Sequence, residues 1–132
     1  MKKGMVLKTV LGIMLLFPLY SQAITLSAYL EVKQLLVQKK TSEEFKSTTQ
    51  AYLNGIANGF NFYAVSVKIH NQGTDFKPLY CPPAKTVQNA DFMIEHVDNY
   101  LEKYPLVKQK QADSPIELIY IQALQDVYPC KD

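Results

Sequence analysis

Two cysteines, Cys81 and Cys130, are the side chains of this 132-residue chain with the clearest capacity for chemistry. Cys81 lies in the stretch "LYCPP" and Cys130 in "VYPCKD", so a neighbouring proline restricts the backbone at each. Such a pair can form a disulfide, supply a reactive thiol or bind a metal. A catalytic thiol needs a histidine and a low pKa, and no pattern marks one here. The choice among these three therefore depends on the compartment in which the protein works.

The two histidines, His70 and His96, have no His or Cys neighbour at the spacing of metal ligands. We interpret both as ordinary surface histidines. The sequence also contains no Gly-rich phosphate loop, no H-E-x-x-H motif and no EF-hand loop. We therefore expect no metal, no cofactor and no catalytic residue, and we favour a binding protein over an enzyme.

An acidic stripe is predicted where four carboxylates recur at the spacing i, i+4, i+7, i+11, namely at Asp91, Glu95, Asp98 and Glu102. On a helix these positions fall within about 60° of one another, and like charges four residues apart repel. Two interpretations stay open: a solvated helix face, or a docking stripe for a positively charged partner. Phe92 lies off the apolar face of the same helix, as an interface anchor or as one exposed apolar side chain. These five residues are the candidate partner-binding residues.

The first 23 residues have the layout of a secretory signal peptide. Lys2, Lys3 and Lys8 precede a short apolar run, and "SQA" supplies a small-x-small cleavage signal, so we expect cleavage after Ala23. The run is too short for a membrane span, which needs about 20 apolar residues. The alternative is a leader that stays attached as an anchor. The Lys-rich leader favours a bacterial export signal and a Gram-negative periplasm, with no membrane attachment after cleavage.

Residues 24–132 then form the mature chain, enough for a single domain. Without the three leader lysines, eleven lysines remain against twelve acidic residues, and the sequence has no arginine. A near-neutral domain without arginine is a poor candidate for binding nucleic acid. Because an oxidising compartment preserves disulfides, a Cys81–Cys130 bridge becomes the favoured use of the two cysteines.

The spacing of apolar residues predicts an all-α fold, a small bundle of about four helices. The first covers 26–39, and the second begins at "TSEE" (41–44) and runs to about Ile69, followed by a turn over 70–78. The third is capped by Thr86 and stopped by Pro105. The fourth begins at "SPIE" (114–117) with a capping box, and its expected inner face extends to Val127. The segment "LVKQKQAD" is expected to be a polar connection.

Gly55 and Gly59 form a G-x-x-x-G pattern inside the second predicted helix. In a membrane this pattern indicates helix dimerisation. In the predicted helix its flanks are polar, and we expect another helix or an aromatic ring to pack closely against the glycines.

Four segments together resemble the Rap/Tai family of periplasmic immunity proteins of type VI secretion. They are "YLNGIANGF", "YCPP", "YLEKYP" and "ALQDVYPC", and they span about Tyr52 to Cys130. The resemblance rests on their order and spacing behind a signal peptide, and the region before Tyr52 does not share it.

The resemblance implies a small all-helical protein with one intramolecular disulfide, usually a homodimer. Such a protein binds an injected cell-wall amidase effector and blocks its active site. By motif, Cys81 and Cys130 would be the disulfide and Gly55 the packing glycine of the second helix. The family's toxin-contacting residues lie outside these motifs and are not transferred.

The leading hypothesis is therefore a non-catalytic inhibitor that protects against intoxication by kin cells. The alternative is a small periplasmic acid-stress chaperone, which would also be helical and hold one disulfide. A small hydrolase is a third class, and the residue inventory argues against it.

Overall fold

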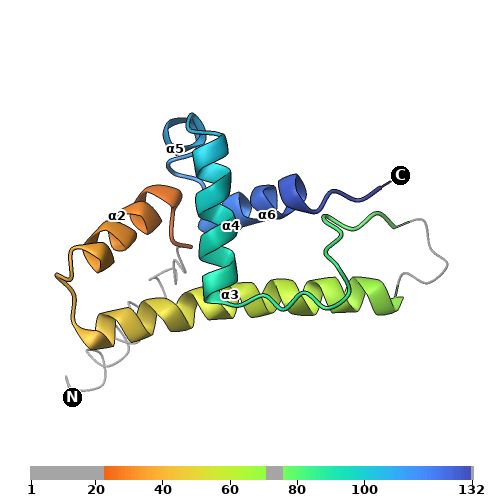
Figure 1. Cartoon of the computed structure of the whole chain (residues 1–132), viewed down its shortest axis with the longest axis horizontal. Helices are drawn as coiled ribbons and strands as arrows, with labels where there is room; N and C mark the ends of the chain where they lie inside the picture. The colour runs from red at the N-terminus through yellow and green to blue at the C-terminus, as the bar shows by residue number, and fades with distance from the viewer. Residues whose placement is uncertain (1–22, 71–75, 132) are drawn as a thin grey trace, which may run out of the picture.

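The computed structural model describes residues 23–70 and 76–131. Within these residues the regular structure is helical, apart from one isolated bridge between Thr25 and Pro115. The helices, labelled as in Figure 1, are α2 (Leu26–Val37), α3 (Glu43–His70), α4 (Ala90–Lys103), α5 (Val107–Lys110) and α6 (Ile116–Val127). The predicted all-α class is confirmed. Residues 1–22 of the predicted leader (1–23) and residues 71–75 of the predicted turn lie outside the described residues.

Helix α3 is the longest element, and α4 stands across its middle (Figure 1). Helix α4 packs against both α3 and α6, and α2 packs against α6. The core lies where these helices meet, and its fully buried side chains include Leu26, Met93, Val97, Ile116, Ile119, Tyr120 and Leu124. Burial of this apolar surface is the main force that holds the helices together.

The start and end of α3 follow from its sequence. The Ser42 hydroxyl accepts a 3.2 Å hydrogen bond from the backbone N–H of Phe45, which caps the first turn. Acidic residues follow in that turn, and Lys68 and His70 occupy the last turn, so both ends complement the helix dipole. The stretch "YAVSVKI" is helical, as its periodicity predicts, and the helix ends one residue beyond the expected Ile69.

The predicted start of the third helix is wrong by one turn. Helix α4 begins at Ala90, and its cap is Asn89, whose side chain accepts a 2.9 Å hydrogen bond from Phe92 N–H. Thr86 instead donates its backbone N–H to Pro83 in a turn. The Asn61 side chain bonds both the N–H and the carbonyl of Gln88, at 2.9 and 2.7 Å, and so holds this segment against α3. That tertiary contact keeps residues 86–88 out of the helix.

The predicted capping box at the start of α6 is also wrong. Pro115 is the cap residue, with no side-chain cap bond, and Ser114 contributes its backbone carbonyl to Leu26 N–H at 2.9 Å. Glu117 accepts a hydrogen bond from the Tyr52 hydroxyl instead of closing the box. The predicted inner face is buried up to Leu124, but Val127 is 47% exposed. Part of the expected polar connection forms the short helix α5.

A buried polar network joins the loop before α4 to α3 and α6. The Tyr80 hydroxyl donates to the Phe60 carbonyl at 2.9 Å and accepts from the Gln88 side-chain amide at 2.9 Å. The Tyr120 hydroxyl donates to the oxygen of the same amide, Gln88 Oε1, at 2.5 Å. Gln88 is the buried polar residue of the described core, and both ends of its amide are satisfied. The network therefore fixes the loop relative to two helices.

The Cys81–Cys130 disulfide predicted from the sequence is present. The two Cα atoms are 4.9 Å apart although 49 residues separate them in the chain. The bridge joins the extended segment before α4 to the segment after α6. Neither cysteine is therefore available as a free thiol or a metal ligand in this state.

The predicted packing role of Gly55 is wrong within this chain. Gly55 and Gly59 are both exposed, and a Cβ atom at either position would meet no heavy atom of the described residues within 4 Å. The α3 residues that face the core are Leu53 and Ala57, on the opposite phase of the helix. The glycines therefore do not serve close packing inside one molecule.

Candidate functional site

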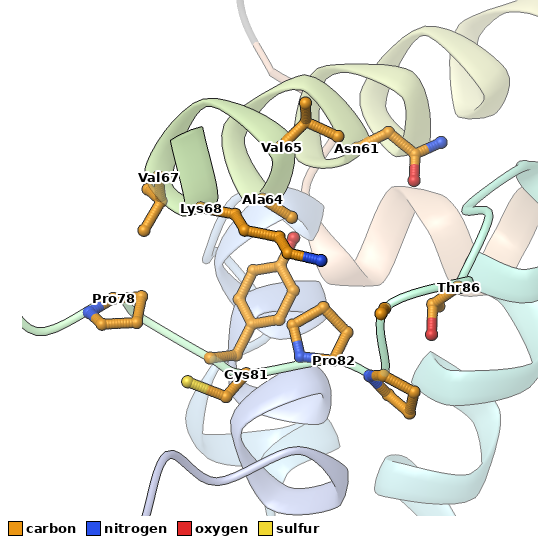
Figure 2. A pocket seen from close by; sticks show the side chains of 12 residues that line it. Asn61, Ala64, Val65, Val67, Lys68, Pro78, Cys81, Pro82 and Thr86 are labelled. Atoms are coloured by element: carbon orange, nitrogen blue, oxygen red, sulfur yellow. The ribbon is translucent and has the colours of Figure 1, made fainter. Parts of the chain in front are cut away.

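An apolar groove lies between the C-terminal half of α3 and the extended segment 78–86 (Figure 2). Its volume is about 290 Å³. Helix α3 supplies Asn61, Ala64, Val65, Val67 and Lys68, and the facing segment supplies Pro78, Tyr80, Cys81, Pro82, Pro83, Ala84 and Thr86. The lining is mainly apolar with few polar groups, which is the composition of binding sites rather than of solvated surface.

The facing segment of the groove is held in place by several independent contacts. The Tyr63 hydroxyl accepts a 2.9 Å hydrogen bond from the Leu79 N–H, and Cys81 N–H donates to the Tyr128 carbonyl at 2.8 Å. The disulfide lies at the same point, and prolines on either side of Cys81 limit the backbone further. An extended segment fixed in this way gives a groove that is formed before any partner arrives.

A row of exposed apolar side chains runs along α3 next to the groove. Phe62, Val65 and Ile69 are 73%, 54% and 62% exposed, and their spacing i, i+3, i+7 places them on one helix face. Val65 belongs both to this row and to the groove lining. Isolated exposed apolar residues are ordinary, but a contiguous set beside a groove indicates an interaction surface.

The charged residue that lines the groove is a lysine, Lys68. The described residues 45–70 and 76–90 include no Asp or Glu, while Lys68 lines the groove and Lys85 lies in the adjoining loop. Asp75, the one acid between these ranges, lies outside the described residues. Lys68 reaches from the helix toward the opposite segment (Figure 2) and makes no ion pair within the described part of the chain. The groove therefore favours a partner that presents apolar side chains next to a carboxylate.

The predicted acidic stripe on α4 is only partly available for a partner. Asp91, Glu95 and Glu102 are exposed, as expected. Asp98 is half-buried and forms an ion pair with Lys33 of α2, so its charge joins two helices of the same molecule. Burial raises the pKa of the neighbouring Tyr29 hydroxyl, and the Asp98 charge raises it further.

Phe92 is not a free anchor, because it belongs to a stack of three rings. Its ring lies 3.9 Å from the His96 ring and 6.5 Å from the Tyr128 ring, measured between centroids. The His96 Nδ1 lies 2.8 Å from the Phe92 carbonyl, which can only accept, so Nδ1 carries a proton. The His96 Nε2 lies 3.2 Å from the Tyr128 hydroxyl. His96 is thus a half-buried structural residue rather than the expected surface histidine.

His70 is exposed at the end of α3, with Nδ1 2.9 Å from the Ser66 carbonyl, as expected for a surface histidine. No group of three or more His, Cys, Asp or Glu side chains in the described ranges is placed to hold a metal ion. In the same ranges, no helix is long and apolar enough to cross a membrane.

Comparisons of the chain with protein-family models, with curated proteins and with solved structures found no match.

Neither the groove nor the exposed row is predicted by the sequence patterns described above. The exposed row could have been found in the sequence, because Phe62, Val65 and Ile69 are apolar residues at helical spacing. They lie on a different face of the helix from the core positions Leu53, Phe60 and Tyr63. No sequence pattern indicates the groove, because the groove depends on where the loop 78–86 folds back against α3.

Proposed function

We propose that this protein is a periplasmic immunity protein that binds and inhibits a peptidoglycan amidase effector of type VI secretion. The proposal starts from the resemblance of the segments between Tyr52 and Cys130 to the Rap/Tai family. It is supported by the arrangement of the disulfide, the groove and the exposed row, because these form a surface suited to binding. The disulfide is also suited to an oxidising compartment such as the periplasm.

The observation that carries the proposal is the rigid apolar groove beside the exposed α3 row. An inhibitor that acts by occlusion needs a surface that keeps its shape and buries apolar side chains at the centre of the interface. Phe62 and Ile69 protrude from a long helix, and the adjoining segment is held by the disulfide. In this account the α3 row enters the effector's cleft and excludes the substrate, without any covalent chemistry.

We place the partner on the α3 surface in preference to the acidic stripe of α4. Asp98 and Phe92 already make contacts inside the molecule, whereas Phe62, Val65 and Ile69 are exposed and Lys68 forms no ion pair with the described residues. The three exposed carboxylates of α4 could still increase the association rate with a basic effector. A homodimer, which the resemblance implies, belongs to the same proposal and is measured by sedimentation of the purified protein.

The proposal is tested in cells that lack this protein and face kin that inject an amidase. We expect such cells to lyse and expect expression of the exported form to protect them. The matched control is the same protein without residues 1–23, which stays in the cytoplasm and should not protect. Failure of the exported form against every amidase effector encoded beside it would contradict the proposal.

A second candidate, an acid-stress chaperone, is favoured by the same exposed row, because chaperones bind clients through apolar surface. The two candidates differ in their response to acid. A chaperone should bind more hydrophobic dye and protect a client protein as the pH falls, whereas an immunity protein should show neither change while it remains folded.

A further inference from the structure

The start of the predicted mature chain lies against a tyrosine and a glutamate from two other helices. The backbone nitrogen of Ile24 is 3.3 Å from the Tyr52 hydroxyl of α3, and this hydroxyl donates to Glu117 Oε1 of α6 at 3.1 Å. One hydroxyl oxygen therefore contacts both the nitrogen and the carboxylate. The nitrogen and Glu117 Oε1 therefore lie no farther apart than the sum of these two contacts, a separation at which opposite charges still attract each other.

Among the residues that the structure describes, the Glu117 carboxylate has no partner for its second oxygen. Glu117 Oε2 is buried, and within these residues no group donates a hydrogen bond to it and no lysine pairs with the carboxylate. A buried carboxylate oxygen without a donor is costly, and such oxygens are normally paired with a cation or an N–H group. Glu117 Oε2 can therefore accept a further hydrogen bond, either from a neutral donor or from a cation.

The chain itself can supply that donor when the leader is removed. Hydrolysis of the Ala23–Ile24 peptide bond consumes one water, leaves a carboxylate on Ala23 and frees the Ile24 nitrogen as an amine. At neutral pH most of this amine binds a proton and becomes an ammonium group. A neutral nitrogen with one N–H is thereby replaced by a cation with three, at the same place beside Tyr52 and Glu117.

We propose that removal of the leader creates an ion pair between the new α-ammonium group of Ile24 and the Glu117 carboxylate, which locks the folded domain. This inference rests on the predicted cleavage after Ala23. The ammonium donates to the Tyr52 hydroxyl and to the Glu117 carboxylate, including Oε2. Cleavage then separates the domain from its leader and also forms the ion pair that stabilises its fold.

The surrounding backbone holds Ile24 where this pair forms. The Ile24 carbonyl accepts from Ile116 N–H at 2.8 Å, and Leu26 N–H donates to the Ser114 carbonyl at 2.9 Å. Ile24 itself is half-buried against the core. The start of the mature chain is thus joined to the beginning of α6, the same turn that contains Glu117, so the ammonium group has little freedom to leave.

The pair has a defined pH dependence. The titratable groups that contact the nitrogen are Tyr52 from α3 and, through it, Glu117 from α6. Burial raises the pKa of Tyr52, the Ile24 N–H lowers it and the Glu117 charge raises it, with a net rise that keeps the hydroxyl neutral. The carboxylate should raise the pKa of the α-ammonium above its unfolded value. The added stability is then complete below the unfolded pKa of the amine and is lost as the pH rises through the folded pKa.

The test uses the disulfide-bonded domain that begins at Ile24, with its α-amino group either free or acetylated, and each form with Glu117 or with Glu117→Gln. We expect acetylation to reduce the folding equilibrium constant about tenfold when Glu117 is present and less than about twofold in Glu117→Gln, since one pKa unit corresponds to a factor of ten. An equal effect of acetylation in both backgrounds would overturn the inference.

A second measurement needs no substitution at Glu117. NMR titration of the isotopically labelled α-amino group should give a pKa above the ordinary range of an α-amino group. A pKa within the ordinary range would overturn the inference even if Glu117→Gln failed to fold. Mass spectrometry of exported protein tests the cleavage separately, and a mature start other than Ile24 would also overturn it. None of these readouts involves an amidase, so the inference and the proposed function can fail independently.

Discussion

The backbone N–H of Cys81 donates a 2.8 Å hydrogen bond to the carbonyl oxygen of Tyr128, two residues before the disulfide partner Cys130. The segment that forms one side of the groove is therefore joined to the end of α6 by a covalent bond and a hydrogen bond at the same point. Removal of the disulfide should act on both the stability of the domain and the shape of the groove.

Replacement of both cysteines by serine should lower the free energy of unfolding by about 2–4 kcal/mol, because the bridge closes a long loop and restricts the unfolded chain. Urea denaturation measures this value. Wild type treated with a reductant is the matched comparison and should lose a similar amount. Equal stability of the oxidised, reduced and double-serine proteins would show that the bridge contributes nothing.

Tyr120→Phe should cost about 1–3 kcal/mol. The substitution keeps the ring but removes the hydroxyl that donates to Gln88 Oε1, and this buried acceptor is then left without its donor. Tyr104→Phe is the control, because Tyr104 is exposed and its partner Asp126 keeps its ion pair with Lys103. The two variants are compared by thermal and chemical unfolding, and an equal, small effect in both would contradict the role assigned to the network.

Gly55→Ala should stabilise the isolated domain by about 0.5–1 kcal/mol. A Cβ at this position meets no heavy atom within 4 Å, and alanine forms helices better than glycine. The measurement is again the free energy of unfolding, with Gly59→Ala expected to behave alike. A loss of stability would mean that Gly55 does pack closely, as the family resemblance implied.

The ion pair between Lys103 and Asp126 predicts a small effect of acid. Hydrogen bonds from Lys103 and Tyr104 hold the pKa of the Asp126 carboxyl below its ordinary value of 3.8. The contribution of the pair is therefore present above that value and lost as the pH falls through the lower, folded pKa. Because the Lys103 side chain is 58% exposed and solvent screens the pair, Asp126→Asn should change stability little at pH 7. The measurement is the thermal unfolding midpoint of both proteins as a function of pH. A midpoint that falls between pH 7 and pH 5 in the wild type but stays constant in Asp126→Asn would contradict this assignment.

The sequence predicts the helices well because each apolar face repeats at helical spacing, as in Leu53, Ala57 and Phe60 of α3. It predicts the disulfide because the predicted export signal and the even number of cysteines lead to the same conclusion. The helix starts at Thr86 and Ser114 were wrong because tertiary hydrogen bonds, from Asn61 to Gln88 and from Leu26 to Ser114, compete with local capping. Local patterns contain no information about such partners.

In the candidate site, too, the sequence predicts local features but not contacts between distant residues. The spacing of Asp91, Glu95 and Glu102 correctly gives an exposed acidic face. It could not reveal that Lys33, far away in the sequence, pairs with Asp98, or that Tyr128 stacks on the Phe92 and His96 rings. The groove depends on the return of the loop 78–86 to α3, and this return is fixed by Tyr80, Gln88 and the disulfide acting together.

We propose that this protein inhibits an amidase through the α3 surface. The most direct test is peptidoglycan hydrolysis by the amidase effector that kin cells inject, measured with and without the purified protein. We expect complete inhibition at a one-to-one ratio by wild type and by Val37→Asp, which alters an exposed apolar residue on α2. Phe62→Asp should fold normally but inhibit at least about 100-fold less well, because a central apolar anchor is lost. An amidase that remains fully active in the presence of excess wild-type protein would contradict the account.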